Sequence, residues 1–159
     1  MLQGVGHTEC LVYTPQELGK FRLKPDVLII NHRGDVQTVL DTKWKKLQSD
    51  VENTTNGVAE TNMYQMFAYA IRFHSLDNVL IFPAVAGVSA KEYRVIDGAR
   101  IREIRIETVN LDRGLAAERP AFIGDLCRML ARGSKFLTQE NVNNIDSRAA
   151  QLSSLRSTI

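Results

Sequence analysis

The stretch that decides the fold is residues 21–44, which read FRLKPDVLIINHRGDVQTVLDTKW. After Pro25 the chain becomes a run of strong β-formers, and a second run of this kind covers residues 36–44. Between the two runs, residues 31–35 read NHRGD and have the chemistry of a turn. The stretch therefore predicts a β-hairpin with strands over residues 21–30 and 36–44.

The register of this hairpin determines which charged side chains meet. With a turn centred between Arg33 and Gly34, Asp26 lies directly opposite Asp41, whereas a turn of odd length places Asp26 diagonally. Side chains alternate along a strand, so Asp41 and Lys43 share one face. Because opposed residues have Cβ atoms only ~4.5–5.5 Å apart, the hairpin is expected to gather two carboxylates and an ammonium group.

This cluster predicts a divalent metal site, because two opposed carboxylates on a half-buried sheet repel each other. Mg²⁺, for which Mn²⁺ would substitute, prefers oxygen ligands and keeps several waters. Asp26, Asp41 and the backbone carbonyl of Thr42, whose side chain is expected to point away, would form a partial ligand shell. Lys43 would then orient a water or stabilise a negatively charged transition state. The alternative is that Asp41 and Lys43 form an ordinary solvated pair on a strand.

The rest of the chain adds strands and helices to this hairpin. Their order predicts an α/β protein of the α+β type, with a mixed β-sheet flanked by helices. One domain over residues 1–137 is expected, followed by a polar tail over residues 138–159 that forms a docked helix. The further elements expected are a lead-in over residues 1–20 with a helix start at residues 14–17, a polar loop over 48–58, a helix over 60–73, strands over 78–83, 93–96 and 101–111, and a helix over 120–132.

Composition limits the class of protein without naming a function. Of the 159 residues, 44% are hydrophobic and 24% are charged, and the net charge of +2 permits nucleic-acid binding without requiring it. No apolar run approaches the ~20 residues that span a bilayer, and no secretory leader is visible, so a cytoplasmic protein without membrane contact is expected. Cys10 and Cys127 are isolated, which excludes a cysteine-rich metal cluster.

Pro25-Asp26 followed by Asp41-Thr42-Lys43 resembles the PD-(D/E)xK nuclease superfamily. Three stretches, at residues 23–27, 39–45 and 64–70, together resemble the nuclease domain of the McrC family, the cleavage subunits of McrBC-type modification-dependent restriction systems. A strand that ends in Pro83 also fits the pattern of this family. The resemblance covers about residues 21–83 and is faint beyond them.

The resemblance implies a Mg²⁺-dependent endonuclease that hydrolyses double-stranded DNA in defence against foreign DNA. Asp26 and Asp41 would bind the metal and Lys43 would be the catalytic lysine. Gln65 and Tyr69 would match a QxxxY element that reaches the active centre or a DNA phosphate, with Gln65 as a further catalytic residue and Tyr69 as a DNA contact. An AAA+ GTPase of the McrB type is the implied specificity partner, with dimerisation in the assembled complex. The N-terminal region that engages this partner is missing here, so a fragment or shortened relative is expected.

Several other residues have both a functional and a structural interpretation. Glu9 is a weak candidate for a further acid upstream of the hairpin, and plain core packing is the alternative for Tyr69. Trp44 is expected to be packed core more often than a DNA contact. The basic side chains that could contact DNA or build a basic surface are Lys24, Lys45, Lys46, Arg72, Arg100, Arg102 and Arg105.

Two other functions remain open from the sequence. A repair or recombination nuclease of the same fold would act on DNA ends or flaps instead of closed duplex. A catalytically inactive nuclease-like module would bind DNA or protein without needing opposed carboxylates.

Overall fold

The computed structural model of the chain describes residues 2–3, 9–48, 55, 57–98, 100–111 and 118–133. The predicted loop over residues 48–58 lies mostly outside them, and the predicted tail over 138–159 lies wholly outside them. Within these residues the elements in chain order are β1 Leu2–Gln3, β2 Cys10–Tyr13, β3 Gly19–Arg22, β4 Val27–Ile30, β5 Val36–Thr42, α1 Glu60–Arg72, β6 Asp77–Pro83, β7 Lys91–Asp97, β8 Arg100–Val109 and α2 Arg119–Gly133.

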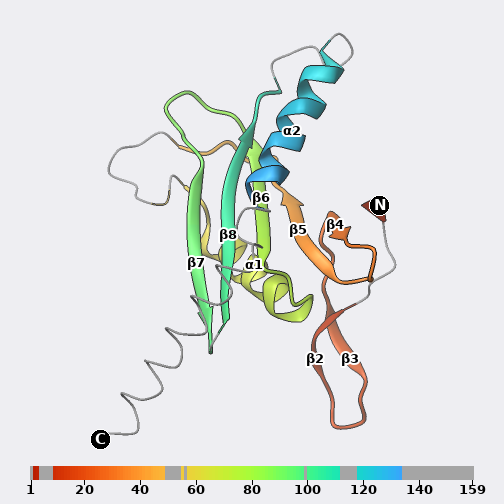
Figure 1. Cartoon of the computed structure of the whole chain (residues 1–159). Helices are drawn as coiled ribbons and strands as arrows, with labels where there is room; N and C mark the ends of the chain where they lie inside the picture. The colour runs from red at the N-terminus through yellow and green to blue at the C-terminus, as the bar shows by residue number, and fades with distance from the viewer. Residues whose placement is uncertain are drawn as a thin grey trace, which may run out of the picture.

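A mixed sheet forms the centre of the molecule, with the strand order β1-β4-β5-β6-β8-β7. Strands β5, β6 and β8 run parallel, while β4 and β7 join them antiparallel on either side. Helix α1 lies behind this sheet and helix α2 in front of it (Figure 1). The predicted α+β fold, a mixed sheet flanked by helices, is therefore confirmed.

Each face of the sheet has its own apolar core, because side chains alternate along the strands. On the α1 face, Val39 and Leu80 pack with Met66 of the helix, and each is 0% exposed. On the α2 face, Val79 packs with Met129. Since the central strands are buried on both faces, neighbouring residues of one strand lie in different cores.

The β4–β5 hairpin has the predicted register next to its open end. Val27 pairs with Leu40, and Leu28 pairs with Val39. The connecting loop, residues 31–35, has an odd length that would slip the pairing, but the register shifts between Ile29 and Ile30. This bulge compensates for the odd loop, so continuing the observed register by one residue sets Asp26 opposite Asp41.

The loop itself is closed by one asparagine, as its turn chemistry predicts. Asn31 Oδ1 accepts hydrogen bonds from the backbone N–H of Arg33 at 2.8 Å and of Asp35 at 3.0 Å. Gly34 has φ +93°, a conformation that side chains with a Cβ rarely adopt. The local sequence therefore specifies where β4 turns back into β5.

The N-terminal part of the chain differs from the prediction. The predicted helix start at residues 14–17 is a turn instead, in which the Glu17 N–H donates to Thr14 O at 2.8 Å. This turn joins β2 to β3 in a two-stranded hairpin that extends away from the large sheet (Figure 1). The strand predicted over residues 21–30 is also interrupted, since β3 ends at Arg22 and Pro25 lacks the N–H that a ladder needs.

The helices lie where their patterns predict. Helix α1 buries Met66, Tyr69 and Ala70, whereas Phe67 of the same helix is 43% exposed. Helix α2 matches the helix predicted over residues 120–132 to within one residue at each end. Among the described residues, no helix is long and apolar enough to cross a membrane.

Two arginines predicted to lie on a basic surface are instead buried in the fold. Arg102 is 2% exposed and Arg105 is 1% exposed. Arg105 makes two hydrogen bonds to Asp77, at 2.8 and 3.0 Å, and one to Glu107 at 2.8 Å. It also donates to the carbonyl of Met129 at 3.0 Å, which ties α2 to the sheet. The alternation of charged and apolar residues along β8 therefore reflects an internal ionic network.

Removing Arg105 should destabilise the protein strongly. Arg105→Met leaves two carboxylates, Asp77 and Glu107, buried without their main partner, and breaking a buried pair in this way costs about 3–5 kcal/mol. Urea denaturation should show this loss in the free energy of unfolding. Arg100→Met is the matched control, because Arg100 is exposed on the same strand and its loss should change stability by less than about 0.5 kcal/mol. Equal stability of the two variants would contradict the structural role of Arg105.

Candidate active site

The candidate site lies at the carboxyl end of β5, between the sheet and α1. Asp41 shares a face with Val39, so its side chain points into the α1 side, where it is 3% exposed. Lys43 lies two residues further on the same face and its side chain is 25% exposed. The alternative that Asp41 and Lys43 form an ordinary solvated pair is therefore wrong, because the carboxylate is buried.

Asp26 is held against the end of β5 by the residue that follows Asp41. Its Oδ2 accepts hydrogen bonds from the backbone N–H of Thr42 at 2.7 Å and from the Thr42 hydroxyl at 2.6 Å. The hydroxyl of Thr42 was expected to point away from the cluster, so its contact with Asp26 is a role that sequence reasoning missed. Both bonds use the same oxygen of the Asp26 carboxylate, so a bound cation would contact the other oxygen.

Lys43 and Asp41 form a close ion pair, with 2.5 Å between Nζ and Oδ2. This buried oxygen nevertheless makes no hydrogen bond of good geometry within the described part of the chain. Burial raises the pKa of the Asp41 carboxyl above its usual range, Lys43 opposes the rise, and the nearby charge of Asp26 adds to it. The two aspartates are thus close enough to repel each other, as the hairpin register predicts.

Helix α1 brings two polar residues to this cluster. Lys43 Nζ donates to Gln65 Oε1 at 2.9 Å, and Gln65 Nε2 donates to the Tyr69 hydroxyl at 2.7 Å. Burial, followed by the charge of Asp41, raises the pKa of Tyr69 to about 12, so its hydroxyl keeps its proton. That proton is directed to Asp41, because a hydrogen bond with Tyr69 lowers the pKa of Asp41. Asp41, Lys43, Gln65 and Tyr69 are thus joined in a closed ring of polar contacts.

Two of the predicted outer residues have other partners. Arg72 pairs with Glu9 at 3.1 Å, and its guanidinium carbon lies 5.2 Å from the centre of the Tyr13 ring. Arg72 thus ties α1 to the β2–β3 region, and Glu9 does not join the two aspartates as a further acid. Tyr69 is 1% exposed, so in this conformation it cannot reach a DNA strand, and its role lies inside the site.

The segment after Lys43 is exposed, contrary to one expectation. Trp44 is 83% exposed, so the prediction that it packs in the core is wrong. Lys45 and Lys46 are exposed as well, and Lys45 Nζ donates to the Gly57 carbonyl at 3.4 Å. A tryptophan and two lysines therefore face solvent directly beside the buried cluster.

The donor set fits a divalent cation of the Mg²⁺ type. Asp41 offers a buried oxygen without a good hydrogen bond, and Asp26 offers a second carboxylate beside it. Within the described ranges, no group of three or more Asp, Glu, His or Cys side chains is placed to hold a metal. Two carboxylates with waters and a backbone carbonyl match the preference of Mg²⁺, which keeps several waters.

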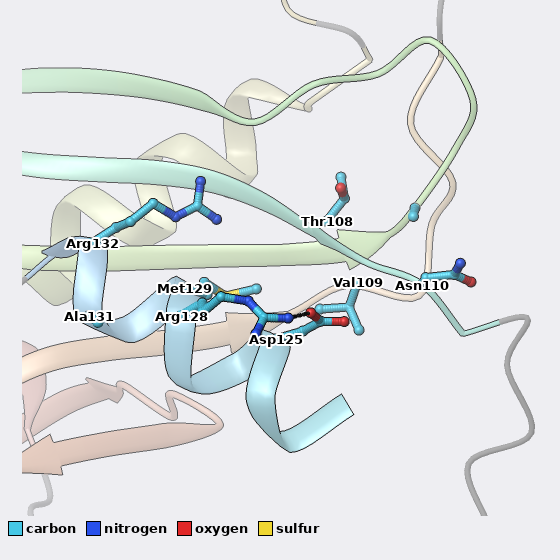
Figure 2. A pocket seen from close by; sticks show the side chains of 9 residues that line it. Thr108, Val109, Asn110, Asp125, Arg128, Met129, Ala131 and Arg132 are labelled. Atoms are coloured by element: carbon cyan, nitrogen blue, oxygen red, sulfur yellow. Dashed lines mark hydrogen bonds and ion pairs between the residues drawn. The ribbon is translucent and has the colours of Figure 1, made fainter. Parts of the chain in front are cut away.

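A cavity of about 630 Å³ lies elsewhere, between the end of β8 and α2 (Figure 2). Its two arginines already have acidic partners, since Arg128 pairs with Asp125 and Arg132 with Glu107. None of the residues predicted for the active centre lines it, so cavity size does not locate the site. The lining residues are Ala84, Thr108, Val109, Asn110, Asp125, Arg128, Met129, Ala131 and Arg132.

The fold and the site together define an α+β protein whose mixed sheet carries paired aspartates and a lysine at the ends of its strands. The family described as McrBC 5-methylcytosine restriction system component matches residues 4–83, just over half of the 159 residues. The chain belongs to this family, and it is a restriction-system component. The matched segment contains the whole Asp26–Tyr69 cluster. No curated protein matches the chain.

The raised pKa of Asp41 predicts how charge affects stability without metal. The folded chain binds the Asp41 proton more tightly than the unfolded chain, so stability falls as the pH rises from the ordinary pKa of 3.8 through the raised value. Asp41→Asn removes this effect. In neutral buffer with chelator the variant should therefore melt at a higher temperature than the unsubstituted chain, by roughly 2–4 °C for each ~1 kcal/mol gained in the free energy of unfolding. The difference should shrink at low pH, where both side chains are neutral. A lower melting temperature for the variant at neutral pH would refute the burial effect.

The ring through Tyr69 predicts a second stability change. Tyr69→Phe removes the hydroxyl that accepts from Gln65 and leaves a partly buried amide N–H unpaired, which should cost about 1–3 kcal/mol in urea denaturation. Tyr64→Phe is the matched control on the same helix, because Tyr64 is 66% exposed. If both substitutions have the same small effect, the hydrogen-bonded ring does not contribute to the folded state.

Proposed function

We propose that this chain is the nuclease component of a modification-dependent restriction system and hydrolyses phosphodiester bonds in double-stranded DNA. The observation that carries the proposal is the buried Asp41 carboxylate, paired with Lys43 and repelled by Asp26, in a member of a restriction-system family. Fold stability alone gives no reason to bury these charges together. The family match favours restriction over a repair nuclease.

Asp26 and Asp41, with the Thr42 carbonyl, would hold Mg²⁺ or Mn²⁺. A bound divalent ion polarises a phosphoryl oxygen and lowers the pKa of a bound water. Thr42 has a positioning role, since its N–H and hydroxyl hold one oxygen of Asp26 and so restrict the orientation of this carboxylate. The raised pKa of Asp41 means that the cation competes with a proton for this carboxylate, so metal affinity should fall as the pH is lowered.

Lys43 would orient the attacking water or stabilise the charge that develops on the phosphate. Gln65 Oε1 accepts from Lys43 Nζ and holds it near the two aspartates, while Tyr69 fixes the orientation of the Gln65 amide. Donors that are already oriented act without reorganisation during the reaction. In this proposal Gln65 and Tyr69 position the lysine from inside the protein.

Sequence and methylation preference would come from a partner. An AAA+ GTPase of the McrB type is the partner that family membership favours. Double-strand cleavage would bring two copies of the nuclease centre together in the assembled complex. By itself, the chain should therefore cut closed circular and linear duplexes with little sequence preference.

Cleavage of supercoiled plasmid tests the proposal. With Mg²⁺ or Mn²⁺ the unsubstituted chain should nick or linearise the plasmid, and Asp41→Ala and Lys43→Ala should each reduce the rate by about 100-fold or more, since both act on charge in the transition state. Gel electrophoresis over time measures the rates. Full activity in both variants would end the proposal.

Two comparisons make this test specific. Asp125→Ala and Lys20→Ala change the same residue types at a partly exposed position on α2 and an exposed position on β3, and should leave the cleavage rate unchanged. Calorimetry with Mn²⁺ separates the roles within the site, because Asp41→Ala should lose metal binding while Lys43→Ala should keep it. DNA binding without any metal uptake would favour an inactive module.

A further inference from the structure

Trp44 is a large, mostly apolar side chain that the fold leaves in water beside the candidate site. It is 83% exposed, although tryptophan is on average highly buried in folded proteins. It directly follows Lys43, whose Nζ binds Asp41 and Gln65. Because tryptophan is enriched in binding interfaces, an exposed tryptophan next to these groups is a candidate contact residue.

The backbone on either side of Trp44 is anchored. The Lys43 N–H donates to the Ile81 carbonyl at 2.8 Å, which ties the segment to β6. Leu47 is 3% exposed and belongs to the core on the α1 face. The short segment that carries Trp44 is therefore attached to the fold on both sides, and this attachment keeps the segment beside Asp41.

The neighbours of Trp44 select the kind of partner. Lys45 and Lys46 follow it and are exposed, so an aromatic ring and two cations share one short segment. Aromatic rings that stack on bases and cations that contact phosphates are the two components of single-strand nucleic-acid surfaces. An acidic peptide could bind to the two lysines alone, so an exposed aromatic ring beside them favours a nucleic acid as the partner.

We propose that Trp44 stacks on a base next to the phosphate that is cleaved, while Lys45 and Lys46 contact the flanking phosphates. The inference rests on the proposed nuclease function and deepens it. A base within an intact duplex has no free face, so the contact requires the duplex to be unstacked at that step. Trp44 would thereby help to place the scissile phosphate at the two aspartates.

The composition of the chain offers a direct measurement, because Trp44 is its single tryptophan. In an Asp41→Asn background, which prevents cleavage, a short mixed-sequence duplex is added while tryptophan emission is recorded. Emission should be quenched in step with DNA binding measured by the anisotropy of labelled duplex. Emission that stays unchanged when the DNA is saturated would overturn the inference.

Substitutions separate stacking from general exposure. In the same background, Trp44→Ala should weaken duplex affinity about tenfold or more, and Trp44→Phe should recover most of this loss because it keeps a ring. Ile96→Ala is the control, since Ile96 is 74% exposed on β7 at the far edge of the sheet, and it should leave affinity unchanged. Equal losses for the Phe and Ala variants would exclude stacking.

Cleavage by the unsubstituted chain distinguishes the two proposals. If plasmid is cut while the Trp44 emission does not respond to DNA, the nuclease function stands and the stacking contact is wrong. If emission is quenched but no DNA is cut with Mg²⁺ or Mn²⁺, the contact stands and the nuclease function is wrong. No duplex binding in low salt would overturn both.

Discussion

The site depends on one buried charge, the carboxylate of Asp41 between the sheet and α1. Removing a carboxylate from water is unfavourable unless other groups compensate for it. Lys43 supplies an opposite charge and Tyr69 supplies a hydrogen bond, yet burial still dominates and the pKa stays raised. The chain therefore carries an arrangement that a cation or a proton would stabilise, and this is the physical basis for a metal site.

A second buried ionic cluster lies on the other face of the same sheet and provides a contrast. Arg105 there satisfies Asp77 with two hydrogen bonds, binds Glu107 and also reaches the backbone of α2. Its carboxylates are paired by a guanidinium whose planar donors match them. That cluster holds α2 to the sheet, whereas around Asp41 one buried oxygen lacks a good hydrogen bond. Incomplete pairing therefore separates the cluster around Asp41 from the fully paired Arg105 cluster.

The geometry of α1 follows from the same constraint. Gln65 and Tyr69 are four residues apart and so lie on one face of the helix. That face covers an otherwise apolar core, which includes Met66 and Leu80. Polar side chains are tolerated there because each bonds to another member of the ring. The helix thus both closes the core and supports Lys43.

Local patterns determined much of this protein. The order of the strands and helices after residue 26, the turn at Asn31 and the shared face of Asp41 and Lys43 all follow from periodicity and turn chemistry, which act between near neighbours in the chain. The register that opposes Asp26 to Asp41 was also predicted, although the reason was incomplete, because a β-bulge compensates for an odd loop.

Only the tertiary structure decided the features that depend on packing between distant segments. The burial of Arg102 and Arg105, the pairing of Glu9 with Arg72 and the exposure of Trp44 are set by which surfaces α1, α2 and the β2–β3 hairpin cover. A strand of alternating charged and apolar residues has the same sequence pattern whether its charged face contacts water or a helix. The helix or hairpin that packs on the strand decides which face is buried, and it is formed by residues far away in the sequence.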